Sequence, residues 1–267
     1  MEYVSKLFGG FGRWLLDFLV QLSRVWNLAL ETFYWIFIGP FKGKSLRWNS
    51  TFEQMVFIGY ESIPIVGLIL FFVGLIIAMQ SAYQLQPFGV TIYVADLTAV
   101  SILRELSPLL TAIVITGRSG SAITAEIGTM KVSEEIDALK TMGLNPIRFL
   151  VVPKMLAMML MVPILTLMAD FVGILGGYLI SMATLDVTSL RYINQTIAAL
   201  QFRDLFSGLV KSYFFSIIIA IIGCYEGFNV EGGAEGVGKS TTRSVVASIF
   251  LIIAADVFFT ALFFSSF

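Results

Sequence analysis

Histidine is absent from this sequence of 267 residues, and cysteine occurs once. A single cysteine, Cys224, excludes an intramolecular disulfide and any cysteine-based metal site. Histidine is the most common general base in enzymes and a frequent zinc ligand, so its absence removes the usual chemical groups of many hydrolases and metalloenzymes. We therefore predict that this chain holds no catalytic residue, no metal site and no bound cofactor.

Charge is scarce as well. Charged residues make up 13% of the chain and hydrophobic residues 57%, and the mean hydropathy is +0.88, which lies outside the range of soluble domains. No Asp, Glu, Lys or Arg occurs from Ser62 to Ala95, a run long enough to cross a hydrocarbon layer of about 30 Å. The net charge of −1 argues against a nucleic-acid partner, because phosphate binding requires a basic surface. We expect an integral membrane protein.

Five apolar segments are long enough to span a bilayer, and we place them near residues 54–86, 97–127, 149–185, 205–228 and 243–265. Pro64, Pro153 and Pro163 give the first and third segments places to bend or to begin. The predicted fold class is an all-α membrane protein with five transmembrane helices. We divide it into an N-terminal helix with a basic linker, residues 1–50, and a transmembrane domain, residues 51–267.

Residues 11–38 combine apolar and charged side chains at helical spacing and include Trp14, Trp26 and Trp35. An amphipathic helix with tryptophans is typical of the membrane surface, where it lies in the plane of the interface. The alternative is a cytoplasmic helix that packs on its own chain.

Lysine and arginine set the expected orientation. With the N-terminus in the cytoplasm, all 17 cationic residues except Arg104, Arg191, Arg203 and Lys211 fall on the cytoplasmic side. An excess of Lys and Arg in cytoplasmic loops is the rule for membrane proteins. The C-terminus is then expected outside the cytoplasm.

Residues 233–240 read GAEGVGKS and match the phosphate-binding pattern G-x-x-x-x-G-K-[ST]. A working phosphate loop joins a buried strand to a helix of an α/β domain, whereas this stretch joins two predicted membrane spans. The run Ile249–Asp256 resembles the apolar strand and aspartate that bind magnesium in such ATPases, but it follows with no room for an α/β fold. We predict no nucleotide binding here, and expect the glycines to form a tight cytoplasmic turn.

Residues 131–146 read KVSEEIDALKTMGLNP and carry helix start and stop signals. Ser133 is placed to cap a short helix, with Glu134 and Glu135 in its first turn, Lys140 in its last and Gly143 after its end. The apolar face would hold Val132, Ile136 and Leu139, and the polar face would hold Glu134, Asp137 and Lys140. The pattern predicts a cytoplasmic helix that docks a partner, the alternative being a solvated loop.

Six ionisable residues lie within the predicted spans, and an unpaired charge at the bilayer centre costs about 2.5 kcal/mol or more. They are Glu61, Arg104, Glu105, Asp170, Lys211 and Asp256. Counting residues along the helices places Arg104, Glu105, Lys211 and Asp256 in the outer half of the membrane. Neighbours on a helix point in different directions, so Arg104 and Glu105 cannot share one partner, and we predict that Lys211 pairs with Glu105 or Asp256.

A polar cluster with apolar walls would suit an amphiphile, with charge near its head group and apolar side chains around its tails. The walls are expected to come from Ile77, Leu85, Phe88 and Leu106. The alternative for Arg104 is that it extends to the interface without a partner in the protein.

The run from Leu103 to Lys154, with its EEIDAL block at 134–139, and the later GAEGVGKSTTRSVV resemble the permease subunit of MCE-type ABC lipid transporters, the MlaE/YrbE family. The resemblance covers the chain from about residue 50 to its end. It implies a homodimer in the bacterial inner membrane with the C-terminus in the periplasm. A separate cytoplasmic ABC ATPase would bind the ATP and dock on a coupling helix near 131–143, through Glu134, Glu135, Ile136, Asp137 and Leu139.

The same resemblance implies that phospholipid binds near Arg104, Glu105, Lys211 and Asp256, below a periplasmic MCE-domain protein. The family usually has Arg where Lys239 stands, and that departure completes the phosphate-loop match. Two other functions remain open. One is an ion-coupled carrier with proton sites at Asp170 and Asp256, and the other is an intramembrane lipid-modifying enzyme that uses Glu105 or Asp256 as acid or base.

Overall fold

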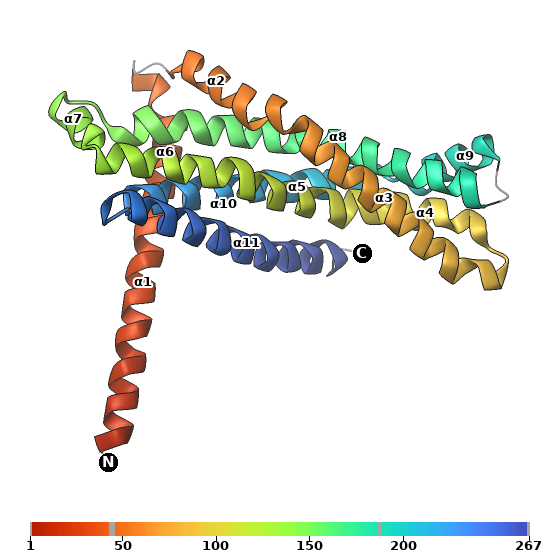
Figure 1. The fold of residues 1–267 in the computed structure, drawn as a ribbon, viewed down its shortest axis with the longest axis horizontal. Coiled ribbons are helices and arrows are strands. Elements are labelled where there is room, and N and C mark those ends of the chain that lie inside the picture. The colour runs from red at the N-terminus through yellow and green to blue at the C-terminus, as the bar shows by residue number, and fades with distance from the viewer. Residues whose placement is uncertain (1, 43–45, 186–187, 266–267) are drawn as a thin grey trace.

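The computed structural model describes residues 2–42, 46–185 and 188–265, and over these ranges the chain folds into helices without a strand. Figure 1 shows a long bundle with one helix, α1, lying across one end. The α-helices are α1 (Glu2–Phe37), α2 (Trp48–Ile58), α3 (Ile63–Leu85), α4 (Val94–Ser101), α5 (Ser107–Ile115), α6 (Ser121–Val132), α7 (Glu135–Thr141), α8 (Val152–Thr184), α9 (Ser189–Ala199), α10 (Phe202–Phe228) and α11 (Gly233–Ser265).

Five helical segments are long and apolar enough to cross a membrane, as predicted. They are Trp48–Phe88, Thr91–Val132, Ile147–Thr184, Phe202–Phe228 and Gly233–Phe263. The first joins α2 and α3 through a 3₁₀ turn, and the second joins α4, α5 and α6 through the π-helical turns η5 (Ile102–Leu106) and η6 (Thr116–Gly120). The third begins with the π-helical turn η7 (Ile147–Val151) and continues as α8, whose interior holds Pro163. The all-helical fold class is confirmed.

Helix α1 lies crosswise to the bundle at the end where α7 is found (Figure 1). Its C-terminal part contributes the buried Leu28 and Ile36 to the main hydrophobic core, whereas Trp26 is exposed. Trp14 lies outside the residues whose side chains the structure describes, and Lys44 lies outside the described chain. A crosswise amphipathic helix at one end of a spanning bundle fits the predicted interfacial position, which stays a prediction.

Helix α9 has no counterpart among the predicted elements. It is amphipathic and lies at the end of the bundle opposite α7 (Figure 1). Its Gln195 Nε2 donates a 2.8 Å hydrogen bond to Asp96 Oδ2 on α4, and Tyr192 packs edge-to-face on Tyr178 of α8. Eleven residues are too few to span a bilayer, so a search for spanning segments passes over such a helix.

Glycines let α3 and α8 approach closely along their shared length. A side chain at Gly74 would overlap the carbonyl oxygen of Gly173, and one at Gly176 would overlap that of Phe71. Helices α6 and α10 also approach closely at a glycine: Thr124 Oγ1 on α6 donates a 3.0 Å hydrogen bond to the carbonyl oxygen of Gly223 on α10. Small residues at helix crossings increase dispersion contacts, which replace the hydrophobic effect as the driving force between helices in lipid.

Arg118 links the second span to the 3₁₀ turn that interrupts the first span. Its guanidinium donates hydrogen bonds to the Phe57 carbonyl oxygen at 2.8 Å, to Ser62 Oγ at 2.7 Å and to Glu61 Oε2 at 2.7 Å. These acceptors surround the 3₁₀ turn Tyr60–Ser62, where the first span changes from α2 to α3. Arg118 therefore satisfies polar groups that the break exposes, and Glu61, one of the ionisable residues of the predicted spans, has its cationic partner here.

We expect Arg118→Ala to lower the free energy of unfolding by about 3 kcal/mol, because it leaves a carboxylate and two other acceptors without a charged donor. Arg118→Lys should fall between the wild type and Arg118→Ala, since an ammonium group lacks the planar fork that reaches several acceptors at once. Unfolding of the purified variants in detergent measures the free energy of unfolding of Arg118→Ala and of Arg118→Lys. Arg243→Ala is the control, because Arg243 is exposed and lies 3.7 Å from Glu226. Equal effects at Arg118 and Arg243 would contradict the assigned role.

Candidate functional site

Lys211 is the centre of a charged cluster formed by three spans. It lies on α10 and is almost fully buried, with 1% of its surface exposed. Its Nζ lies 2.5 Å from Glu105 Oε2 on η5, 2.9 Å from Asp256 Oδ1 on α11 and 2.7 Å from Thr260 Oγ1. The predicted pairing of Lys211 is thus confirmed with both candidate carboxylates. One lysine and two carboxylates leave the cluster with a net charge of −1 when all three are ionised.

The cluster is open on one side. The Glu105 side chain is 39% exposed, compared with 14% for Asp256 and 2% for Lys211. Thr260 Oγ1 also lies 3.1 Å from Glu105 Oε1, so the hydroxyl connects the lysine to the exposed carboxylate. An ammonium group buried behind two acids is held in place by them, while the carboxylate of Glu105 remains accessible to a molecule from outside the chain.

Arg104 points away from this cluster, as expected for a neighbour of Glu105. Its Nε donates a 2.5 Å hydrogen bond to Asp204 Oδ1, which belongs to the first turn of α10. Asp204 is buried and also accepts a 3.0 Å hydrogen bond from the backbone N–H of Gln201, completing a capping box. Arg104 therefore has a partner within the protein.

Two residues of this region were missing from the predicted site. Asp204 falls just before the predicted span 205–228, so it was not counted among the membrane-embedded charges. The spacing of Gln201 and Asp204 at the start of an apolar helix is a capping signal that could have found it. Thr260 has no such signal, because a threonine in an apolar helix commonly bonds only to its own backbone.

The predicted apolar walls are distributed over different parts of the chain. Leu106 is next to Glu105 in η5. Ile77 and Leu85 belong to α3, which packs mainly on α8, and Leu85 contacts the small core of Ala78, Ala82 and Val94. Phe88 is exposed in the turn Gln86–Phe88 after α3. Leu106 thus neighbours the charged cluster in the chain, and the substrate-binding role of all four residues stays a prediction.

Asp170 lies on α8 and is not among the ion-pair partners of Lys211. It is buried, and its Oδ1 accepts no hydrogen bond from a described residue. No described lysine or arginine forms an ion pair with it. Asp170 and Asp256, the two predicted proton sites of an ion-coupled carrier, are therefore in different environments.

The predicted cytoplasmic helix exists as α7, with one correction at its start. Ser133 does not cap it: the serine hydroxyl donates to the Thr129 carbonyl oxygen at 3.0 Å and to Glu135 Oε1 at 2.9 Å. Glu134 is at the N-cap position instead, in the left-handed conformation with φ 60°. The serine is used by the preceding α6, whose last turn extends to Val132. Lys140 lies in the last turn and Gly143 ends the helix with φ 73°, as predicted.

The two faces of α7 differ in accessibility. Ile136 and Leu139 are buried in the main core, so they anchor the helix to its own chain. Val132 was predicted to belong to the apolar face of this helix. The structure contradicts that prediction, because Val132 is exposed and belongs to α6. The residues that α7 and its flanks present to solvent are Glu134, Glu135, Asp137, Ala138, Lys140, Thr141 and Met142. This outer face is what a partner protein would contact.

Glycine at position 134 should stabilise the start of α7. The left-handed conformation costs a residue with a Cβ atom about 1 kcal/mol, so we expect Glu134→Gly to leave stability unchanged or raise it by up to that amount. Glu135→Gly should instead lower stability by about 0.5–1 kcal/mol, because Glu135 has helical geometry. Thermal unfolding of the two variants makes the comparison, and a larger loss for Glu134→Gly than for Glu135→Gly would contradict the assigned backbone role.

The phosphate-loop pattern is helical. Gly233–Ser240 forms the first turns of α11 rather than a loop, and Lys239 Nζ pairs with Glu235 Oε1 at 2.7 Å. The tight turn predicted from the glycines is confined to the start of α11, where Gly232 and Gly233 have φ 85° and 71°. A phosphate loop joins a buried strand to a helix, whereas Gly233–Ser240 follows α10 and begins α11, so this part of the chain has no strand that would direct its backbone N–H groups at a phosphate.

Comparisons with known proteins place this architecture among transporter subunits. The profile of the family described as "Permease MlaE" matches residues 51–262, from α2 to α11. A "Probable ABC transporter permease protein" of Rickettsia prowazekii is 41% identical over 212 residues, which cover 79% of this chain and 82% of that protein. One from Synechocystis is 42% identical over 229 residues, with 86% and 87% covered. The chloroplastic protein TRIGALACTOSYLDIACYLGLYCEROL 1 of Arabidopsis thaliana is 38% identical over 223 residues, with 84% and 63% covered.

Proposed function

Because this chain belongs to the MlaE permease family and is an ABC transporter permease, we propose that it moves phospholipids between the inner membrane and periplasmic MCE-domain proteins. In this proposal two copies of the chain form the membrane channel, and a separate cytoplasmic ATPase supplies the energy. The N-terminus and α7 face the cytoplasm, and α9 faces the periplasm.

The single observation that supports lipid as cargo is the position of the Lys211 cluster. It combines a buried cation, an accessible carboxylate and apolar helix surfaces, which matches an amphiphile better than a small polar solute. Lys211 lies nine residues after the start of α10, about 14 Å along the helix, so it is at acyl-chain depth below the α9 end. The name of the Arabidopsis relative contains a lipid, trigalactosyldiacylglycerol, which points to the same class of cargo.

An ATPase partner is supported by α7. A short helix with an anchored apolar face and an exposed polar outer face is a rigid docking element, and ABC transporter permeases depend on a partner for ATP hydrolysis. The stretch that matches the phosphate-loop pattern, Gly233–Ser240, is the start of α11 and not a loop between a strand and a helix, which supports a separate ATPase.

Reconstitution tests the proposal. The chain is co-purified with the proteins encoded next to its gene, incorporated into vesicles with fluorescent phospholipid, and assayed for lipid transfer with and without ATP. We expect ATP-dependent transfer that requires the ATPase, together with phospholipid in mass spectra of the purified complex. ATP hydrolysis by the isolated chain would contradict the proposal. Transport driven by a proton gradient without ATP would favour the ion-coupled carrier, and chemical conversion of lipid would favour the enzyme.

A further inference from the structure

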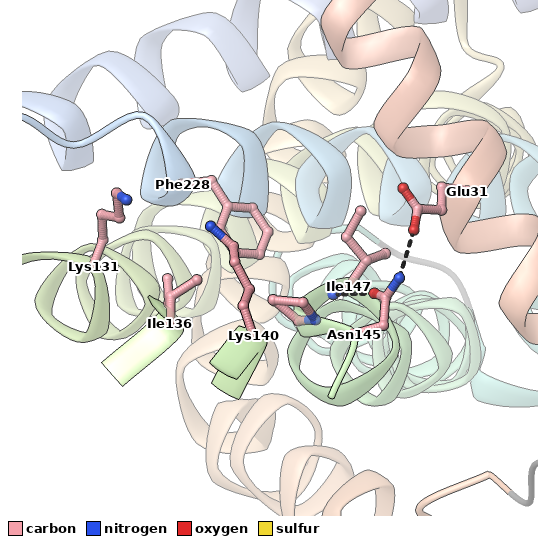
Figure 2. A pocket seen from close by; sticks show the side chains of 8 residues that line it. Glu31, Lys131, Ile136, Lys140, Asn145, Ile147 and Phe228 are labelled. Carbon is pink, nitrogen blue, oxygen red and sulfur yellow. Dashed lines mark hydrogen bonds between the residues drawn. The ribbon is translucent and has the colours of Figure 1, made fainter. Parts of the chain in front are cut away.

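A polar pocket lies at the opposite end of the bundle from the Lys211 cluster. It has a volume of about 460 Å³, within the range of small-molecule sites, and it opens between α1, α7, the start of η7 and the adjacent ends of α6 and α10. Figure 2 shows the side chains that line it: Glu31, Lys131, Ile136, Lys140, Asn145, Pro146, Ile147 and Phe228. Phe228 lies 17 residues beyond Lys211 on α10, about 25 Å along the helix, so the two sites are separate.

The pocket is at the level of the membrane surface. Lys131 is next to the last residue of the second span, Ile147 is the first residue of the third, and Phe228 is the last residue of the fourth. Helix α1, which provides Glu31, is amphipathic and lies across this end of the bundle (Figure 1). A pocket at the ends of three spans and beside a surface helix is at the depth of lipid head groups.

One wall of the pocket is cationic. The carboxylate of Asp137 bridges two lysines, with Oδ1 2.8 Å from Lys140 Nζ and Oδ2 3.5 Å from Lys131 Nζ. The hydrogen bond from Lys140 and the charge of Lys131 lower the pKa of Asp137, so its carboxylate is ionised at neutral pH. Two lysines and one aspartate carry a net charge of +1, and each ammonium group has three N–H donors. The bridge thus holds two cations together and leaves donors for an anion.

The opposite wall is anionic and held rigidly. Glu31 Oε1 accepts hydrogen bonds from Asn145 Nδ2 at 2.8 Å and from Trp35 Nε1 at 3.4 Å. Asn145 is itself fixed, because its Oδ1 accepts the backbone N–H groups of Ile147 and Arg148 at the start of the third span. Both bonds to Glu31 use the same oxygen, so Oε2 is available as an acceptor. Figure 2 shows Ile147 between Glu31 and the two lysines.

We propose that this pocket binds the head group of a phospholipid that carries both a phosphate and a primary ammonium group, as phosphatidylethanolamine does. The phosphate would accept from Lys131 and Lys140, and the ammonium group would donate to Glu31. The apolar side chains between them contact the ethylene carbons and the glycerol. A quaternary ammonium cannot donate a hydrogen bond, and a head group without an amine leaves Glu31 without a partner, so phosphatidylcholine and phosphatidylglycerol fit less well.

The experiment measures lipid retention by the full chain, without an ATPase. The protein is purified from nanodiscs that contain equal amounts of phosphatidylethanolamine, phosphatidylcholine and phosphatidylglycerol, and retained lipid is identified by native mass spectrometry. We expect a preference for phosphatidylethanolamine of about tenfold, the effect of one charge-assisted hydrogen bond. Glu31→Gln should abolish the preference, and Lys131→Gln with Lys140→Gln should reduce retention of all three lipids.

The matched controls change the same residue types outside the pocket. Glu235→Gln and Lys239→Gln alter the exposed ion pair on α11 and should leave retention unchanged. Lys140→Gln alone serves if the double lysine variant does not fold. Equal retention of the three lipids by the wild type, or an unchanged preference in Glu31→Gln, overturns the proposal. Lipid retained equally by the wild type and the lysine variants would belong to the Lys211 cluster, whereas a preference that Glu31→Gln removes belongs to this pocket, so the two proposals fail on different results. With α1 in the cytoplasm, as the proposed function requires, the bound lipid belongs to the cytoplasmic leaflet.

Discussion

Lys211→Met is expected to abolish lipid transfer and to lower the free energy of unfolding by about 3–5 kcal/mol, because it leaves Glu105 and Asp256 together in the membrane without their cation. This is the largest effect that a single substitution should have in this protein. Transfer between reconstituted vesicles measures the first part, and unfolding in detergent measures the second. Lys239→Met is the control, since Lys239 is 70% exposed on α11 and its loss should change neither quantity.

A triple variant separates the two consequences of this substitution. Lys211→Met combined with Glu105→Gln and Asp256→Asn removes the lysine and both acids, so no charge of the cluster remains uncompensated and most of the stability should return. Transfer should stay low, because the accessible carboxylate and the buried cation that we propose to face the cargo are gone. If the triple variant transfers lipid at the wild-type rate, the cluster has a structural role only and does not bind the cargo.

Ala138→Trp is expected to prevent assembly with the ATPase while leaving the fold intact. Ala138 lies on the exposed face of α7, between the solvent-facing Asp137 and Thr141, and its side chain contributes nothing to the buried core. A large ring at the centre of a closely packed interface should reduce co-purification of the ATPase and ATP-driven transfer on the order of a hundredfold. Quantitative pull-down with the purified ATPase measures the binding.

The matched control for this variant is Ala198→Trp. Ala198 is also an exposed alanine on a short helix, but on α9, at the other end of the bundle. It should leave ATPase binding unchanged. Leu139→Ala is a second comparison: Leu139 is buried, so its loss should lower the stability of α7 through a cavity rather than through the loss of a contact with a partner. Normal ATPase binding by Ala138→Trp would show that α7 is not the docking element.

Counting residues along the helices predicted part of the charged cluster. The depth of each charge along its helix follows from a rise of about 1.5 Å per residue, and a lone cation among acids in a membrane must pair with one of them. The pairing of Lys211 was therefore predictable. That it contacts both acids and Thr260 depends on how η5, α10 and α11 are rotated about their axes, which no spacing within one helix specifies.

Helix α7 shows the same limit at its start. Helix signals act over one or two turns, so the position of α7 could be predicted. The signals were the acidic residues at its start, Lys140 in its last turn and Gly143 after its end. Ser133 was equally suited to begin α7 or to end α6, and its hydroxyl bonds to Thr129 because α6 continues further than the pattern indicated. Competition between two adjacent helices for one side chain is decided by how both pack.

The amino-acid sequence by itself determined the class of the molecule. Long apolar runs with few charges require spanning helices, because hydrocarbon admits only segments whose backbone is internally bonded. Tertiary structure alone decided which distant groups meet: Arg118 at the break of the first span, Asp204 with Arg104, and Glu31 across a pocket from Lys131 and Lys140. Each of these contacts joins helices far apart in the chain. Their geometry follows from helix crossing and rotation, which depend on the packing of the whole bundle.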